Sequence, residues 1–210
     1  MITEKLIAEK LLQVEAIKFS PDKPFTWASG WKSPIYCDNR KVLSFPYVRD
    51  YIKSELCNKV FEQYPHADLI AGVATAGIAW GVMIADQLKL PFIYVRPKPK
   101  EHGMGNQIEG FFEKGQNVVV IEDLVSTGKS SLQVVDVLRE NGMNIMGMIS
   151  IFQYEFSKSI NDFKSAQVEF TSLTNYTSIL QLAIDKKIIS EENLPLLNDW
   201  RLNPDTWQGI

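Results

Sequence analysis

Two adjacent carboxylates, Glu122 and Asp123, follow an apolar run at residues 118–121 and precede a loop of small and hydroxylated residues at 124–131. The apolar run predicts a buried strand, which would deliver both carboxylates to its carboxyl end. A helix is predicted at 128–141, and its first N–H groups and positive dipole end can bind a phosphate. Two carboxylates are a poor arrangement for binding phosphate alone, because all of these groups are negatively charged. They can, however, accept hydrogen bonds from the hydroxyls of a sugar a few ångströms away. The segment therefore predicts a site for a ribose 5-phosphate.

Two other interpretations of this segment are open. A strand, an Asp-led turn and a capped helix can form without any ligand, although the acidic pair and the hydroxylated loop would then coincide for no reason. Gly128-Lys129-Ser130 also matches the end of the nucleotide P-loop, G-x-x-x-x-G-K-[ST]. The first glycine of that motif would fall at Asp123, where a carboxylate would repel the phosphates. This argues against a P-loop.

A second group of chemically useful residues lies at 96–110, where Arg96, Lys98, Lys100 and His102 occur within seven positions. Prolines and glycines flank them, which predicts a mobile loop. Lysine and histidine there could neutralise the charge on a departing anion. Composition alone favours a solvated surface loop.

A dinucleotide-binding fingerprint is a further interpretation of the same loop, because Gly103-x-Gly105 would begin one. The third glycine would fall at Ile108, and no helix is predicted to open there, so we reject this interpretation. A third turn, Thr75-Ala76-Gly77, follows the apolar run at 67–74. Its small residues would allow either close approach to a ligand or close packing of a helix on a strand.

The elements that must position these residues are apolar runs that alternate with helical patterns, which predicts a parallel sheet covered on both faces. Ligands of such sheets bind at the carboxyl ends of the strands, so we expect the turns at 74–77, 96–110 and 122–130 to meet. Strands are predicted at 67–74, 91–96, 117–123, 145–152 and 168–173, a hairpin at 25–38, and helices at 3–17, 46–64, 78–88, 128–141, 175–184 and 190–200.

Composition excludes several classes of protein. The chain has 210 residues, 45% of them hydrophobic, and a net charge of −3, which fits one globular domain and disfavours nucleic acid as the main partner. Two cysteines, Cys37 and Cys57, form no disulfide framework and favour a reducing compartment. The N-terminus shows no signal peptide or membrane span, so we expect a cytoplasmic protein.

The segment 118–131 resembles the signature with which type I phosphoribosyltransferases bind PRPP (5-phosphoribosyl 1-diphosphate). By this resemblance the acidic pair holds the ribose 2- and 3-hydroxyls, the loop holds the 5-phosphate, and the turn at 75–77 binds pyrophosphate. The PRPP-binding residues that the resemblance implies are Glu122, Asp123, Leu124, Val125, Ser126, Thr127, Gly128, Lys129, Ser130, Thr75, Ala76, Gly77 and Lys98.

The loop at 96–110 resembles the catalytic loop of the orotate-using members of that family, where it closes over the active site of the neighbouring subunit. By this resemblance, Arg96, Lys100 and His102 are catalytic residues that contact pyrophosphate. The resemblance also implies a homodimer in which each active site is shared between the two subunits. Residues 25–36 resemble the N-terminal hood of the same enzymes. The implied orotate-binding residues are Ser126, Tyr36, Lys32 and Gln153, and Arg40 or backbone donors are alternatives for the orotate carboxylate.

The resemblance covers about residues 1–185 and implies an α/β fold with a central parallel sheet flanked by helices. It implies a hood at about 1–45, a core at 46–175 and a C-terminal helical cap at 176–210. The implied activity is glycosyltransfer in pyrimidine biosynthesis: PRPP and orotate give orotidine 5′-phosphate and pyrophosphate. Mg²⁺ would be held mainly by the diphosphate of PRPP, because the two histidines show no spacing for a protein metal site.

Two rival functions share this signature. One is transfer of the phosphoribosyl group to a purine. The basic loop and the hood argue against it. The other is a PRPP-sensing transcriptional regulator without catalysis. That interpretation requires a DNA-binding helix-turn-helix and a basic face, neither of which the sequence shows.

Overall fold

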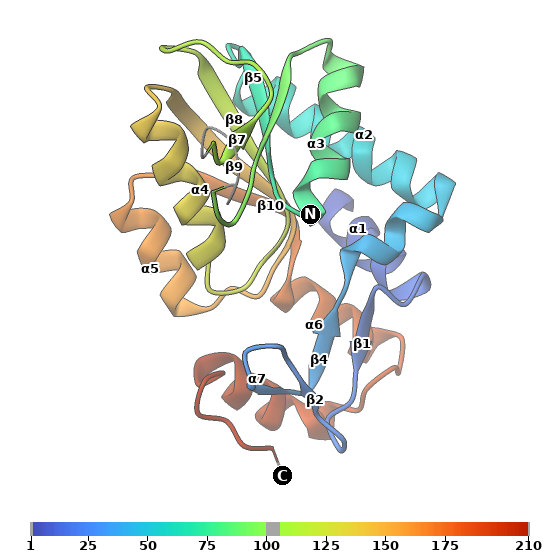
Figure 1. The fold of residues 1–210 in the computed structure, drawn as a ribbon. Helices are drawn as coiled ribbons and strands as arrows, with labels where there is room; N and C mark the ends of the chain where they lie inside the picture. Colours follow the sequence, from blue (N-terminus) through green and yellow to red (C-terminus); the bar gives the residue numbers. More distant parts are fainter. Residues whose placement is uncertain (1, 100–105, 210) are drawn as a thin grey trace.

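The computed structural model of the chain describes residues 2–99 and 106–209 (Figure 1). At its centre is a six-stranded sheet in which every neighbouring pair is parallel except the last, which is antiparallel. The strands, in their order across the sheet, are β10 (Phe170–Asn175), β9 (Asn144–Gln153), β8 (Asn117–Val125), β5 (Leu69–Val73), β6 (Phe92–Val95) and β7 (Ile108–Glu109).

Alternate residues of the central strands point to opposite faces of the sheet, as the pleat requires. Val119 and Ile121 of β8 join one hydrophobic cluster, together with buried side chains of α2 (Pro46–Gln63) and α3 (Ala76–Leu88). Val118 and Val120 join the other, with α4 (Lys129–Glu140) and α5 (Ser157–Ser165). The sheet is therefore covered on both faces, which Figure 1 shows with α3 on one side and α4 on the other.

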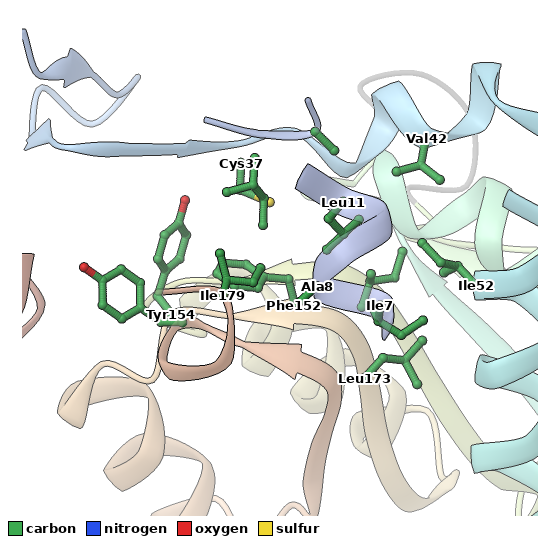
Figure 2. Close-up of a cluster of buried hydrophobic side chains, with 14 of the residues drawn as sticks. Ile7, Ala8, Leu11, Cys37, Val42, Ile52, Phe152, Tyr154, Leu173 and Ile179 are labelled. Atoms are coloured by element: carbon green, nitrogen blue, oxygen red, sulfur yellow. The ribbon is translucent and has the colours of Figure 1, made fainter. Parts of the chain in front are cut away.

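The first helix, α1 (Ile2–Gln13), packs on β10 and on α6 (Tyr176–Asp185). Ile7 and Leu11 are fully buried there, in the same cluster as Phe152 and Leu173 of the sheet (Figure 2). Cys37 joins this cluster from the N-terminal segment. The core of the sheet and the N-terminal segment are thus continuous.

The N-terminal segment forms two small antiparallel pairs: β1 (Ile17–Phe19) with β4 (Ile35–Cys37), and β2 (Phe25–Thr26) with β3 (Lys32–Ser33). The β2–β3 hairpin turns at Gly30, whose φ of +88° favours glycine. A 3₁₀ helix, η1 (Asn39–Ser44), then leads into α2. At the other end of the chain, η2 (Glu191–Asn193) and α7 (Leu194–Leu202) lie beside this hairpin (Figure 1).

Several features differ from the sequence prediction. The helix predicted at 3–17 ends at Gln13, and Ile17 already belongs to β1, a strand that was not expected. The edge strand β7 was not expected, and it pairs antiparallel with β6. Helix α5 was also missed, because its nine residues are mostly polar and bury only Ser159 and Phe163. Among the residues described, no helix has the length and apolar character needed to cross a membrane.

Candidate active site

The carboxyl ends of β5 and β8 meet at a cavity of about 360 Å³, as the sequence predicted for the turns at 74–77 and 122–130. The third side of the cavity is formed by the end of β4 and the start of η1. The residues that line it are Cys37, Asp38, Arg40, Val73, Ala74, Thr75, Ala76, Glu122, Asp123, Leu124 and Ser130.

The turn at 74–77 lies against β8 because Gly77 has no side chain. A Cβ atom at Gly77 would stand 2.4 Å from the backbone oxygen of Ile121, closer than any real contact allows. The start of α3 can therefore pack directly on β8, one residue before the acidic pair. Of the two roles that the sequence left open for these small residues, close helix–strand packing is confirmed at Gly77, and it places Thr75 and Ala76 on the cavity wall.

Glu122 and Asp123 are both buried, with exposures of 6% and 9%. The Glu122 carboxylate accepts hydrogen bonds from the backbone N–H of Asp123 (3.0 Å) and from the hydroxyl of Ser131 (3.3 Å). Burial raises the pKa of Glu122, and the neighbouring negative charge of Asp123 raises this pKa further. Burial also raises the pKa of Asp123. Within residues 2–99 and 106–209, neither carboxyl has a directly bonded cation.

Asn39 fixes the position of Asp123 from the N-terminal side. Its side chain is fully buried, and its amide nitrogen donates to the backbone oxygen of Asp123 at 2.7 Å. Its amide oxygen accepts from the thiol of Cys37 at 3.4 Å. The sequence prediction did not include Asn39 or Cys37, although the polar run that directly follows β4 was a usable signal.

Arg40 stands at the edge of the cavity in a bidentate pair with Asp38, at 2.6 and 3.0 Å. Its hydrogen bonds lower the pKa of the Asp38 carboxyl. A bidentate pair fixes the plane of the guanidinium, so the remaining N–H groups have a defined direction. Arg40 was only an alternative in the sequence prediction, and the structure places it on the cavity.

The loop after Asp123 ends at Gly128, the N-cap residue of α4, with φ of +78°. A glycine offers no side chain to bond the first N–H groups of the helix, so these donors are available to an anion. Ser130 in the first turn lines the cavity, and Ser126 and Thr127 are partly exposed. Val125 is buried, so any contact that it makes with a ligand would be through its backbone.

The basic residues at the third strand end are only partly described. Arg96 forms an ion pair with Glu109 of β7, at 3.7 Å between Nη1 and Oε1, and Lys98 is exposed. Lys100 and His102, the predicted catalytic residues, lie outside the described residues. Their roles, and those of Arg96 and Lys98, stay predictions.

Three of the predicted orotate-binding residues make contacts elsewhere in the described structure. The ammonium of Lys32 donates to the hydroxyl of Thr26 at 2.8 Å, and the ring of Tyr36 packs beside Phe25. The amide of Gln153 donates to the hydroxyl of Ser172 at 2.8 Å. None of the three lines the cavity. Their roles, and that of Ser126, are untested and stay predictions.

Comparison with known proteins fits this geometry. Residues 52–179 match the family described as "Phosphoribosyl transferase domain". The chain is 51% identical to an orotate phosphoribosyltransferase of Phocaeicola vulgatus, over 98% of this chain and 97% of that protein. It is 47% identical to one of Listeria innocua, over 99% of each. The crystal structure of the Aeropyrum pernix orotate phosphoribosyltransferase superposes with a TM-score of 0.74 at 28% identity, covering 83% of this chain and 96% of that one.

The chain therefore belongs to the type I phosphoribosyltransferase family. Identities near 50% over almost the whole chain place it, within that family, among the orotate phosphoribosyltransferases.

The burial of Glu122 generates a prediction about stability. Because the folded-state pKa is raised above the ordinary value of 4.5, this carboxyl favours folding most below pH 4.5, and that contribution is lost as the pH rises through the folded-state pKa. Glu122→Gln removes the charge and keeps both partners, since the Ser131 hydroxyl can also accept. We expect the free energy of unfolding at about pH 8 to rise by about 1 kcal/mol.

Urea unfolding at about pH 8 and about pH 5 checks this. The difference in free energy of unfolding between Glu122→Gln and the wild type should be smaller at the lower pH. Glu62→Gln, an exposed change on α2, serves as the matched control and should alter neither value. A Glu122→Gln variant less stable than the wild type at the higher pH would contradict the assignment of a costly buried charge.

Proposed function

We propose that this chain transfers the 5-phosphoribosyl group of PRPP to orotate, giving orotidine 5′-phosphate and pyrophosphate. The observation that carries the proposal is the buried acidic pair near the carboxyl end of β8, followed after a short loop by α4, whose N-cap residue Gly128 has no side chain. That arrangement suits a sugar diol next to a phosphate. The choice of orotate as the base rests on the relatives, which are orotate phosphoribosyltransferases.

In the proposed reaction, the bond from the anomeric carbon to the diphosphate breaks, a bond to a ring nitrogen of orotate forms, and the proton of that nitrogen is released to the departing pyrophosphate or to solvent. Glu122 and Asp123 accept hydrogen bonds from the ribose 2- and 3-hydroxyls, and the first turn of α4 holds the 5-phosphate. The sugar is then fixed at both ends, which orients the anomeric carbon for displacement. Lys100 and His102 would neutralise the charge on the departing pyrophosphate.

The cavity also fits a magnesium ion that is bound with the diphosphate. Asp38, Glu122 and Asp123 are among the residues that line it, and carboxylate oxygen is a ligand that Mg²⁺ prefers. Among the residues described, no group of three or more His, Cys, Asp or Glu could hold a metal by itself. We therefore propose that PRPP supplies most of the ligands. When bound, the ion would neutralise charge on the leaving group.

We also propose a cytoplasmic location. Cys37 and Cys57 are both buried and form no disulfide, as is usual for proteins of reducing compartments.

The proposed activity predicts that the purified chain consumes orotate when PRPP and Mg²⁺ are both present. The loss of orotate absorbance measures this directly, and omission of PRPP or of Mg²⁺ should abolish it. Adenine and hypoxanthine, tested by release of pyrophosphate, should give at most a small fraction of the rate. Purine turnover without orotate turnover would assign the chain to another branch of the family. DNA binding that depends on salt, without any turnover, would instead indicate a regulator.

We propose a homodimer in which the loop at 96–110 of each subunit serves the site of the other. Lys100→Ala would then damage only the loop, and Asp123→Asn only the pocket. Each variant alone should lose activity, roughly 100-fold for Lys100→Ala. Co-expressed, the two chains should form mixed dimers with one intact site, restoring roughly a quarter of wild-type activity.

Light scattering should show a dimer, and activity should be measured with PRPP near its wild-type KM. The two variants purified separately and assayed together without subunit exchange are the control. If the co-expressed mixture is no more active than the sum of the separate variants, each loop serves its own subunit.

A further inference from the structure

Six aromatic side chains join four parts of the chain; we call them the aromatic cluster. Trp27 and Trp31 come from the β2–β3 hairpin, Tyr154 and Phe156 follow β9, Tyr176 begins α6, and Trp200 lies on α7. Trp200 is at the centre, because its ring lies 5.4 to 5.8 Å from those of Trp27, Tyr154, Phe156 and Tyr176. It is fully buried. A single residue of the C-terminal cap thus contacts the hairpin and the core at once.

The indole N–H of Trp200 makes a directional contact with the hairpin. It donates to the backbone oxygen of Lys32 on β3 at 3.0 Å. Since Lys32 is exposed and its own ammonium binds Thr26, this backbone bond, rather than the lysine side chain, ties the hairpin to α7.

The hairpin needs such support because it has little structure of its own. Strands β2 and β3 are two residues long each, and a hairpin of that size is marginally stable in water. Beyond strand pairing, its internal backbone bonds are Trp27 N–H to Trp31 and Gly30 N–H to Trp27, both 2.9 Å, among the residues described. Its position must therefore come from packing against other elements.

The supported segment leads directly to the active site. Five residues after Lys32 is Cys37, which lines the cavity, and then Asn39, which holds the backbone oxygen of Asp123. On the other side of the cluster, the backbone N–H of Tyr154 donates to the backbone oxygen of Val125, the last residue of β8, two residues after the acidic pair. Trp200 thus lies between two segments that both end at the cavity.

We propose that Trp200 is a positioning residue for the base side of the site: it fixes the β2–β3 hairpin in place before the substrate binds. This inference rests on the proposed function, because the hairpin and the strand after it carry Lys32 and Tyr36, two of the residues predicted to bind orotate. Pre-ordering of that segment removes an entropic cost from orotate binding. PRPP, held by β8 and α4, depends on it much less.

Trp200→Phe tests the inference, since it keeps an aromatic ring and removes the N–H donor. The matched control is Tyr176→Phe, which removes another buried hydrogen bond of the same cap, from the Tyr176 hydroxyl to the backbone oxygen of Leu197 (2.9 Å). That bond does not involve the hairpin. We expect similar decreases in melting temperature for both variants, because each loses one buried bond.

The two variants should differ in kinetics. Trp200→Phe should raise the KM for orotate roughly fivefold, about the effect of one hydrogen bond, with the KM for PRPP unchanged. Tyr176→Phe should leave both unchanged. Hydrogen exchange at residues 25–36 should be faster in Trp200→Phe only. If Trp200→Phe does not fold, Trp27→Leu, which weakens the cluster from the hairpin side, should show the same selective rise.

An equal orotate KM in the two variants, with equal exchange at 25–36, would overturn the positioning role and leave Trp200 as a packing residue. The wild-type assay separates this outcome from failure of the proposed function. If the wild type does not use orotate at all, the function is wrong, whereas hydrogen exchange still decides whether Trp200 holds the hairpin.

Discussion

The architecture of this protein depends on the burial of two adjacent carboxylates at the end of a central strand. Burial of Glu122 and Asp123 is costly, and it raises the pKa of both. Hydrogen bonds to the Glu122 carboxylate from the N–H of Asp123 and the hydroxyl of Ser131 offset part of that cost. Both of these donors bond the Glu122 carboxylate, which is therefore held in place without a ligand. The rest of the site is arranged around the acidic pair: α3 packs against the residue directly before the pair, and α4 begins six residues after Asp123.

The site is completed from outside the sheet. The segment at 37–40 lies on the opposite wall of the cavity, and Asn39 bonds it to the strand that carries the acidic pair. The aromatic cluster around Trp200 then joins the preceding hairpin to the C-terminal cap. Residues at both ends of the chain thereby hold one wall of a site whose other wall belongs to the core. This explains physically why the C-terminal helices are packed against the hood.

The sequence predicted the parts of this arrangement that local patterns encode. Apolar runs next to helical periodicity indicated the strands and helices of the core, and the acidic pair before a glycine-containing loop indicated the phosphate site. Contacts between distant residues left no such pattern. The bond of Asn39 to Asp123 joins residues 84 positions apart, and that of Trp200 to Lys32 joins residues 168 apart. For the same reason the sequence alone did not show that the Gln153 amide binds Ser172, or that β7 returns along β6.

The central claim is that the acidic pair and the start of α4 bind the two ends of one ribose 5-phosphate. A crystal structure of the chain with PRPP and Mg²⁺ tests it most directly. We predict the ribose 2- and 3-hydroxyls within hydrogen-bonding distance of Glu122 and Asp123, with the 5-phosphate on the backbone N–H groups of residues 126–130. Density for PRPP elsewhere, with Glu122 still bonded only to Ser131 and to the N–H of Asp123, would contradict the account.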